Sequence, residues 1–254
     1  RITSVLTLGQ FIKAISSFLG PIIAGAASSF WGDWKLIFAV YAATTLISTI
    51  WLISTIPGKE HLEAAKATFG TTLSLFKDKY IVSLFLGILF IVGIDVGLNT
   101  SIPKLLMERT DMALSEAGLG TSLYFAARTI GSFAGAFLLA KLSGARFLKY
   151  SMFVAIAAFV LLLLVPGTWS MFAMIVIVGL ACANVFSIIF SYALQHKPER
   201  ANEISALMIM GVSGGALITP LMGIVSDGFG QVAGLSVLLL CMLYICLISF
   251  RLTK

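Results

Sequence analysis

Polar side chains inside long apolar runs are the residues best able to bind a ligand or a proton in this sequence. Asp95 and Asn99 lie four residues apart, so in a helix they share one face. Ionisable groups within a membrane normally face the interior of a helix bundle, because facing lipid costs several kcal/mol. There the pair could bind solute hydroxyls, or Asp95 could bind a proton. The alternative is that the helix ends near Pro103 and both groups are simply hydrated at the membrane surface.

Arg128 stands near the middle of another apolar run, too deep for its side chain to reach either surface easily. It could bind an anionic or hydroxyl-rich solute, or pair with Asp95 as a structural bridge. Tyr124, one turn earlier, could stack on a ring of a bound solute or be a packed aromatic residue. Asn184 needs hydrogen-bond partners at this depth, which a solute or neighbouring helices could supply.

Two further polar residues lie in the first apolar run. Gln10 and Lys13 are three residues apart and project from neighbouring points on one helical face. Lys13 is close enough to the start of the run to extend its ammonium group to the membrane surface.

The composition shows what kind of element must position these groups. Of 254 residues, 59% are hydrophobic and only 11% are charged, whereas soluble domains have about 25% charged residues. The apolar runs are continuous rather than alternating, which favours helices over a lipid-facing barrel. Since a helix needs about 20 residues to cross a bilayer, we predict an all-α polytopic membrane protein with about eight transmembrane helices.

The same composition argues against other classes of protein. The net charge of +6 comes from basic residues in short loops, not from a basic face that would bind nucleic acid. The three cysteines lie in apolar runs without metal-ligand spacing, and both histidines lie in loops. We find no nucleophile–base pairing and no phosphate-binding loop, so we predict that the chain is not an enzyme and binds no metal or cofactor.

The predicted spans are separated by short polar segments. Their approximate bounds are Val5–Phe30, Trp34–Ile56, Tyr80–Ile102, Ala117–Leu142, Phe147–Val165, Ser170–Leu194, Ile204–Ser226 and Val232–Phe250. With eight spans, twelve Lys and Arg residues fall on one side of the membrane and three on the other. Positive loops favour the cytoplasm, so we predict a multi-pass protein of the plasma (inner) membrane with both ends of this chain cytoplasmic.

The longest polar connection, residues 57–79, predicts a boundary between two bundles. Residues 1–56 would be the last two helices of a first half, and residues 80–254 a complete six-helix second half. An internal repeat agrees: Gly20-Pro21 in the first span and Pro220 in the seventh are each followed by similarly spaced small residues. Parallel six-helix repeats are a known plan of membrane transporters.

Several small residues are predicted to serve helix packing. Glycines let two helices approach closely in a membrane. The predicted packing positions are Gly20, Pro21, Gly131, Gly135, Gly211, Gly214, Gly215 and Pro220.

Three segments resemble the major facilitator superfamily, in particular sugar permeases related to the fucose and glucose/galactose proton symporters. They are Leu6 to Pro21, Ser122 to Leu139 and, most specifically, Ile188 to Asp227 with its sequence SGGALITPLMGIVSD. The resemblance aligns the chain with helices five to twelve of a twelve-helix fold. It implies alternating access, a substrate site near the bilayer midplane between two halves, and a cavity-lining role for Gln10.

The resemblance also implies that part of the machinery lies outside this sequence. In such symporters acidic residues on helices one and four couple to protons, and those helices would be missing partners of this chain. We therefore predict a proton-coupled transporter of a monosaccharide or similar small polar solute, and we expect no transport by the 254 residues alone. An efflux carrier of amphipathic compounds and a non-transporting fragment are the alternatives.

Overall fold

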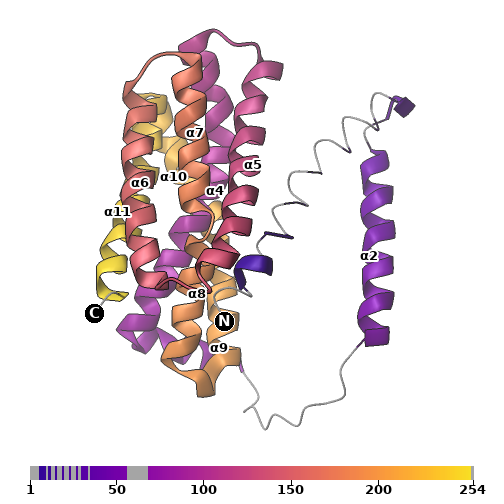
Figure 1. Cartoon of the computed structure of the whole chain (residues 1–254), viewed down its shortest axis with the longest axis vertical. Coiled ribbons are helices and arrows are strands. Elements are labelled where there is room, and N and C mark those ends of the chain that lie inside the picture. The colour runs from indigo at the N-terminus through magenta and orange to yellow at the C-terminus, as the bar shows by residue number, and fades with distance from the viewer. Residues whose placement is uncertain are drawn as a thin grey trace. The chain divides into compact units, whose positions relative to one another are not determined.

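The computed structural model describes residues 35–55 and 68–252, together with scattered positions between 6 and 33. Every regular element in this described part is a helix, and none is a strand (Figure 1). The predicted all-α class is therefore confirmed. The chain divides into two compact units, one comprising Ile15–Ala65 and the other Arg1–Ala14 with Lys66–Lys254.

The smaller unit contains helix α2, Leu36–Thr55, which corresponds to the second predicted span. At 20 residues it is long and apolar enough to cross a membrane. Its threonines bond within the helix: Thr45 Oγ1 donates to the carbonyl of Tyr41 at 2.7 Å, and Thr49 Oγ1 to that of Thr45 at 2.8 Å. These polar groups therefore need no partner in lipid. The first predicted span lies largely outside the described residues.

The larger unit is a helix bundle (Figure 1). Its elements are α3 Phe69–Ser74, η1 Leu75–Lys77, α4 Lys79–Thr110, α5 Leu114–Leu138, α6 Gly144–Leu164, α7 Thr168–Cys182, α8 Val185–His196, η2 Pro198–Arg200, α9 Ala201–Met210, η3 Gly211–Ser213, α10 Gly214–Phe229 and α11 Gln231–Leu252. In the described part, six helical segments are long and apolar enough to span a membrane. Helix α5 has the length, with 25 residues, but is not one of the six.

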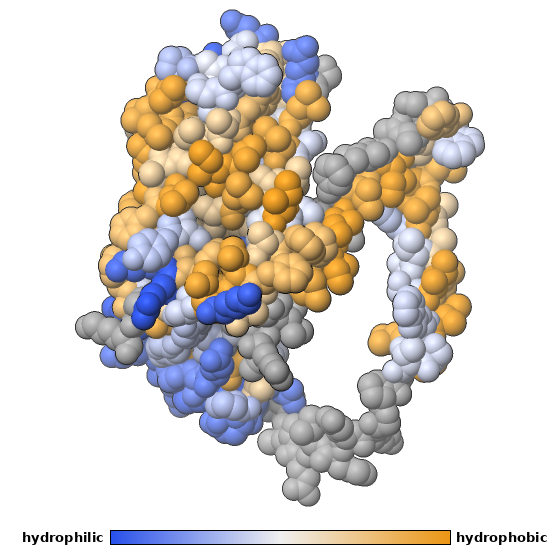
Figure 2. All heavy atoms as spheres, in the orientation of Figure 1, coloured by the Kyte–Doolittle hydropathy of each residue, from blue (hydrophilic) through white to orange (hydrophobic). Residues whose placement is uncertain are grey.

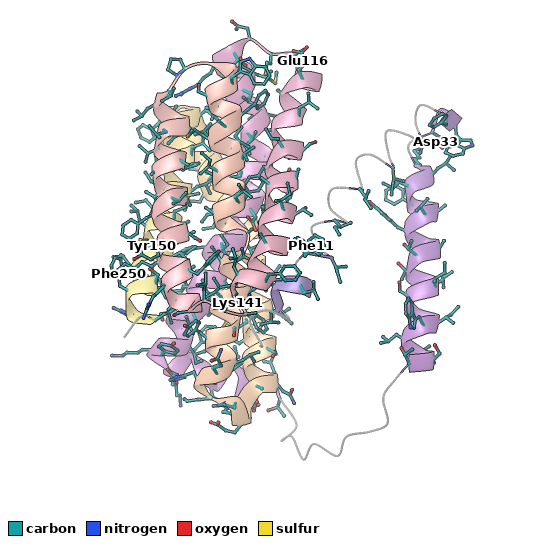
Figure 3. All side chains as sticks on the ribbon, viewed as in Figure 1. Phe11, Asp33, Glu116, Lys141, Tyr150 and Phe250 are labelled. Carbon is teal, nitrogen blue, oxygen red and sulfur yellow. The ribbon has the colours of Figure 1, made fainter. Side chains whose placement is uncertain are left out.

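The surface of this bundle suits lipid. Large apolar side chains such as Ile130, Phe153, Leu164 and Leu240 are exposed on its helices. Figure 2 shows apolar residues along the flank of the bundle and hydrophilic ones at its two ends. Glu116 and Lys141 lie toward these opposite ends (Figure 3). A soluble protein would not expose so much contiguous apolar surface, so this unit is membrane-embedded.

Helix α4 extends further than predicted. We expected the span to end near Ile102, but the helix continues through Pro103 to Thr110. Proline lacks the N–H that would bond the carbonyl four residues earlier, which here is that of Asn99. The Thr121 hydroxyl donates to this carbonyl oxygen at 3.3 Å instead. This bond from α5 supplies a partner at the point where proline leaves the α4 ladder open.

The sixth predicted span is two helices rather than one. Helix α7 ends at Cys182 and α8 begins at Val185. The Ala183 carbonyl at this break accepts a bond of 3.5 Å from the Ser132 hydroxyl of α5. A break inside a membrane is tolerated when neighbouring helices bond the freed backbone groups.

Helices α4 and α10 approach closely through glycines. A Cβ atom added to Gly214 would collide with the backbone of Leu89, at 2.6 Å from its carbonyl carbon. A Cβ at Gly215 would meet Val96 Cγ2 at 2.7 Å, and one at Gly211 would meet Ile88 Cγ2 at 2.9 Å. At Gly214, where the neighbour is backbone, no side chain would fit without moving the two helices apart.

A polar cluster holds the end of the bundle where α4 begins. The Asp78 carboxylate caps α4 by accepting from the Tyr80 amide at 2.9 Å, and it also accepts from Lys197 Nζ at 2.6 Å. His196 Nε2 lies 3.1 Å from the same carboxylate. The Lys197 bond is the main reason that the pKa of Asp78 falls well below its ordinary value. The cluster thus ties the start of α4 to the segment after α8.

Candidate functional site

The two ionisable residues predicted deep in the membrane lie together between α4 and α5. Arg128 Nη1 forms an ion pair with Asp95 Oδ1. The Tyr124 hydroxyl donates to the same carboxylate oxygen at 2.8 Å. One carboxylate therefore accepts from both donors, and the two helices are joined by a charge-assisted contact.

Burial explains why the three groups need one another. The Arg128 side chain is 12% exposed and that of Asp95 20%, while Tyr124 is fully buried. The guanidinium carbon of Arg128 lies 6.0 Å from the centroid of the Tyr124 ring, at the limit of a cation–π contact. The pair neutralises both charges in an apolar bundle, and the remaining exposure of Asp95 leaves it accessible from the bundle surface.

The other predicted solute-binding residues are placed differently. Asn99 is exposed, one turn beyond Asp95 on α4. Asn184 is buried at the break between α7 and α8, and its Nδ2 donates to the carbonyl of Gly131 at 3.0 Å. A Cβ at Gly135 would collide with the Asn184 amide group. Asn184 thus fills the space that two glycines leave on α5, and its contact with a solute stays a prediction.

Some predicted positions lie outside the described residues. These are Gln10, Lys13, Gly20 and Pro21. Next to Gln10, the ring of Phe11 is described, and its centroid lies 5.1 Å from that of Phe133 on α5.

A polar pocket of about 300 Å³ lies beyond the ion pair, between α4, the last turns of α10 and the start of α11. It is formed by helices of one bundle, whereas the resemblance implies a site between two halves. Its volume is at the lower limit for small-molecule sites. Lys104 and Asp227 line it with opposite charges, and they form no ion pair with each other or with another described residue. The full lining is Thr100, Ser101, Lys104, Thr219, Met222, Gly223, Ser226, Asp227, Gln231 and Gly234.

This pocket was not predicted from the sequence. Ser226-Asp227 ends the segment that carries the family resemblance, but nothing in the sequence places it opposite Lys104. The Thr219 hydroxyl is buried without a partner among the described residues. The pocket therefore offers hydroxyl, amide, ammonium and carboxylate groups, which are the groups that bind a small polyhydroxylated molecule. In the described part, no cluster of His, Cys, Asp or Glu could hold a metal ion.

Together, the long apolar helices and the polar groups buried between them define the class of polytopic membrane proteins. The family model of the Major Facilitator Superfamily matches residues 2–220. The chain belongs to this superfamily.

Two curated relatives indicate which members of the superfamily this chain is similar to. A putative glucose/galactose transporter of Helicobacter pylori (strain J99 / ATCC 700824) is 27% identical over 186 residues, which are 71% of this chain and 46% of the relative. The glucose/galactose transporter of Brucella abortus biovar 1 (strain 9-941) is 24% identical over 174 residues, covering 68% of this chain and 42% of the relative. The chain thus spans less than half the length of these relatives.

Solved structures share the fold. The transporter FucP in its outward conformation matches with a TM-score of 0.72 and 18% identity, covering 87% of this chain and 54% of that protein. A second structure, of the E. coli fucose:proton symporter FucP, matches with a TM-score of 0.72 and 20% identity. This match covers 86% of this chain and 54% of that protein. A bacterial homologue of the lysosomal transporter Spinster gives 0.57 over 98% of this chain and 69% of that structure, at 18% identity. These likenesses support the predicted major facilitator fold.

Proposed function

We propose that this chain forms the second half, and part of the first half, of a proton-coupled monosaccharide transporter. The curated relatives named as glucose/galactose transporters support the solute class. The observation in this molecule that carries the proposal is the polar pocket, in which Lys104 and Asp227 offer unpaired charges to solute hydroxyls. Hydrogen bonds to charged groups are worth about 1.5–3 kcal/mol each, enough to orient a sugar.

The division of roles follows from the contacts of Asp95. Its carboxylate already accepts from Arg128 and Tyr124, so we assign it to joining α4 and α5 beside the transport path. Proton coupling is assigned mainly to acidic residues on first-half helices, supplied by the rest of the transporter. The end of the bundle bearing Lys77, Lys141 and Arg200 faces the cytoplasm of a plasma-membrane protein in this proposal.

Uptake of labelled monosaccharides by proteoliposomes tests the proposal. In the full-length transporter containing this chain, a pH gradient, acidic outside, should drive glucose or galactose accumulation, and dissipating it should abolish accumulation. Accumulation that is indifferent to the gradient would remove the proton from the proposal. The 254 residues reconstituted alone are expected not to accumulate sugar.

Substitutions in the pocket test its assignment separately. Lys104→Met or Asp227→Asn should raise KM about tenfold, because each removes a charged hydrogen-bond partner. Glu116→Gln is the matched control, since Glu116 is exposed and lies outside the pocket. Unchanged KM in both pocket variants would exclude this pocket as the solute site while leaving transport itself intact.

A further inference from the structure

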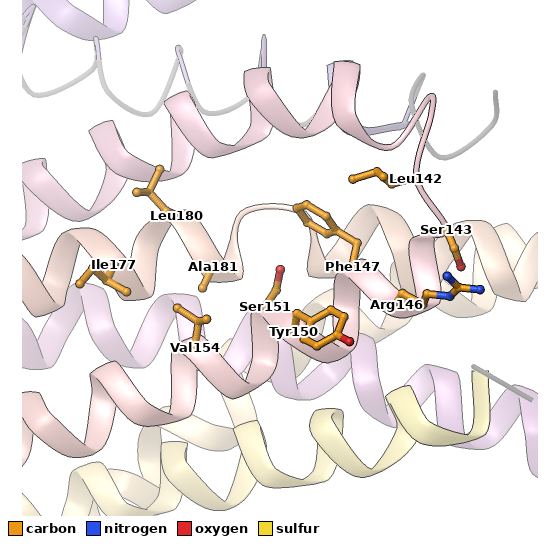
Figure 4. Close-up of a pocket in the computed structure, with 10 residues that line it drawn as sticks. All are labelled: Leu142, Ser143, Arg146, Phe147, Tyr150, Ser151, Val154, Ile177, Leu180 and Ala181. Carbon is orange, nitrogen blue, oxygen red and sulfur yellow. The ribbon is translucent and has the colours of Figure 1, made fainter.

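A groove of about 550 Å³ opens on the bundle (Figure 4). None of its lining residues belongs to the ion pair or to the polar pocket. It lies where the segment after α5 leads into α6, beside α7. Its lining residues are Leu142, Ser143, Arg146, Phe147, Tyr150, Ser151, Val154, Ile177, Leu180 and Ala181.

The lining changes from polar to apolar along the groove. Ser143 and Arg146 lie at one end, and Val154 and Ile177 lie toward the other (Figure 4). Tyr150 is placed between them. A molecule that matches this order has a polar head and an apolar tail.

The length of the groove matches one leaflet of a bilayer. Ser143 and Val154 are eleven residues apart, which corresponds to about 16 Å along a helix. The hydrocarbon core of a bilayer is about 30 Å thick. A groove that begins at the end of the bundle and runs this far therefore covers the depth of a single acyl layer.

The charge at the polar end is positive. Arg146 is exposed, and its guanidinium forms no hydrogen bond or ion pair within the described part of the chain. Lys141 precedes the groove, and Lys149 follows Arg146 on α6 with its ammonium 4.4 Å from the centroid of the Phe250 ring. No acidic residue lines the groove. The polar end is thus complementary to an anion.

We propose that this groove binds one anionic phospholipid. Arg146 and the Ser143 hydroxyl bind its phosphate, and an acyl chain lies along Tyr150 toward Val154 and Ile177. The positive groups favour a lipid with net negative charge, such as phosphatidylglycerol, over zwitterionic phosphatidylcholine.

Lipid retention measured by native mass spectrometry tests the proposal. The full transporter containing this chain is reconstituted in nanodiscs of equal parts phosphatidylglycerol and phosphatidylcholine, then released into mild detergent. The wild type should retain phosphatidylglycerol preferentially. Arg146→Gln should lower this retention about fivefold, as expected for one interfacial cation, and Arg146→Lys should largely restore it. Lys77→Gln is the matched control, an exposed cation at the same end but outside the groove.

The groove itself is tested at its apolar end. Val154 is exposed, so Val154→Trp should be tolerated and should lower retention by obstructing the acyl chain while Arg146 stays in place. Equal retention of both lipids, or equal losses for Arg146→Gln and Lys77→Gln, would overturn the proposal. So would unchanged retention in Val154→Trp, because the lipid would then be held at its headgroup alone.

Discussion

At the scale of single residues, the ion pair between Asp95 and Arg128 joins two opposite charges inside the bundle. Each partner alone would be a buried charge next to lipid or apolar side chains, and together they are neutral. Breaking such a pair costs more than removing both members, since the residual cost is an uncompensated charge. This asymmetry gives a direct test.

We expect Asp95→Asn to lower the free energy of unfolding by about 3 kcal/mol, because Arg128 loses its counter-charge. The double variant Asp95→Asn with Arg128→Met should be more stable than the single one. Tyr124→Phe, which removes one hydroxyl bond, should cost about 1 kcal/mol. Equilibrium unfolding in mixed detergent micelles measures all three. If the double variant were the least stable, the pair would not be the unit we describe.

At the scale of helices, close approach decides the packing of α4 on α10 and of α5 on the α7–α8 break. Gly214 lies against the backbone of Leu89, and Gly135 lies against the side chain of Asn184. Leu89 is held by the backbone of α4, and Asn184 is held by its bond to the Gly131 carbonyl, so neither neighbour can easily retreat. Small residues are common where membrane helices touch, but only some glycines of this chain are in such contact.

Gly214→Ala should therefore destabilise the bundle by about 1–3 kcal/mol, the usual cost of overpacking. Gly228→Ala in the same helix is the control, because a Cβ there meets nothing within 4 Å. It should be neutral or slightly stabilising, since alanine favours helices. The unfolding midpoint in mixed micelles reports both, and equal midpoints would argue against close packing at Gly214.

The contact between Gly135 and Asn184 calls for a double-mutant cycle. Gly135→Ala should be destabilising when Asn184 is present and close to neutral in the Asn184→Ala background. The expected coupling is about 0.5–3 kcal/mol, as for residues in direct contact. Strictly additive effects of the two substitutions would mean that the side chains do not meet.

How far the sequence predicts these elements depends on whether the signal is local. Helical spacing predicts that Tyr124 and Arg128 share one face of their helix. A bridge between Arg128 and Asp95 could also be stated from the sequence, as one of two alternatives. The break at Ala183-Asn184 could not, because no proline or glycine marks it and its support comes from Ser132, far away in sequence. Such long-range partners carry no signature in a single sequence.

Pro103 and the polar pocket make the same point. Pro103 looked like a helix end, yet α4 continues because Thr121 bonds the carbonyl that proline leaves open. The pocket between α4 and α10 depends on which turn of one helix lies opposite which turn of the other. That register is set by packing, so Lys104 and Asp227 were not recognised as neighbours.

At the scale of the whole bundle, the Asp78 cluster connects elements that are far apart in sequence. Asp78 caps α4 and bonds Lys197 beyond α8, while Arg200 Nη2 donates to the Thr71 carbonyl of α3 at 2.6 Å. These bonds join the segment before α4 to the segment after α8 at this end of the bundle. Its stability should depend on pH in a defined direction.

The pKa of Asp78 is lowered in the folded protein from its ordinary value of 3.8. A carboxyl group with a lowered pKa stabilises the fold at pH values above its ordinary pKa. This contribution is lost as the pH falls from the ordinary pKa toward the pKa in the folded protein. Asp78→Asn keeps the helix cap but removes the charge. The stability difference from wild type should shrink as the pH falls below about 4. A difference that vanished near pH 6 would assign the titration to another group.

Helix α5 carries a consequence for biosynthesis. By length and hydropathy, six segments of the described part are apolar enough to cross a membrane, and α5 is not one of them. Arg128 lies near the centre of α5. An arginine there opposes insertion by the translocon by about 2.5–3.5 kcal/mol. Helix α4 is synthesised before α5, is strongly apolar, and is separated from α5 by three residues. Its Asp95 forms the ion pair with that arginine. We therefore expect α4 and α5 to enter the membrane as one hairpin, with the charge pair formed before either helix meets lipid alone.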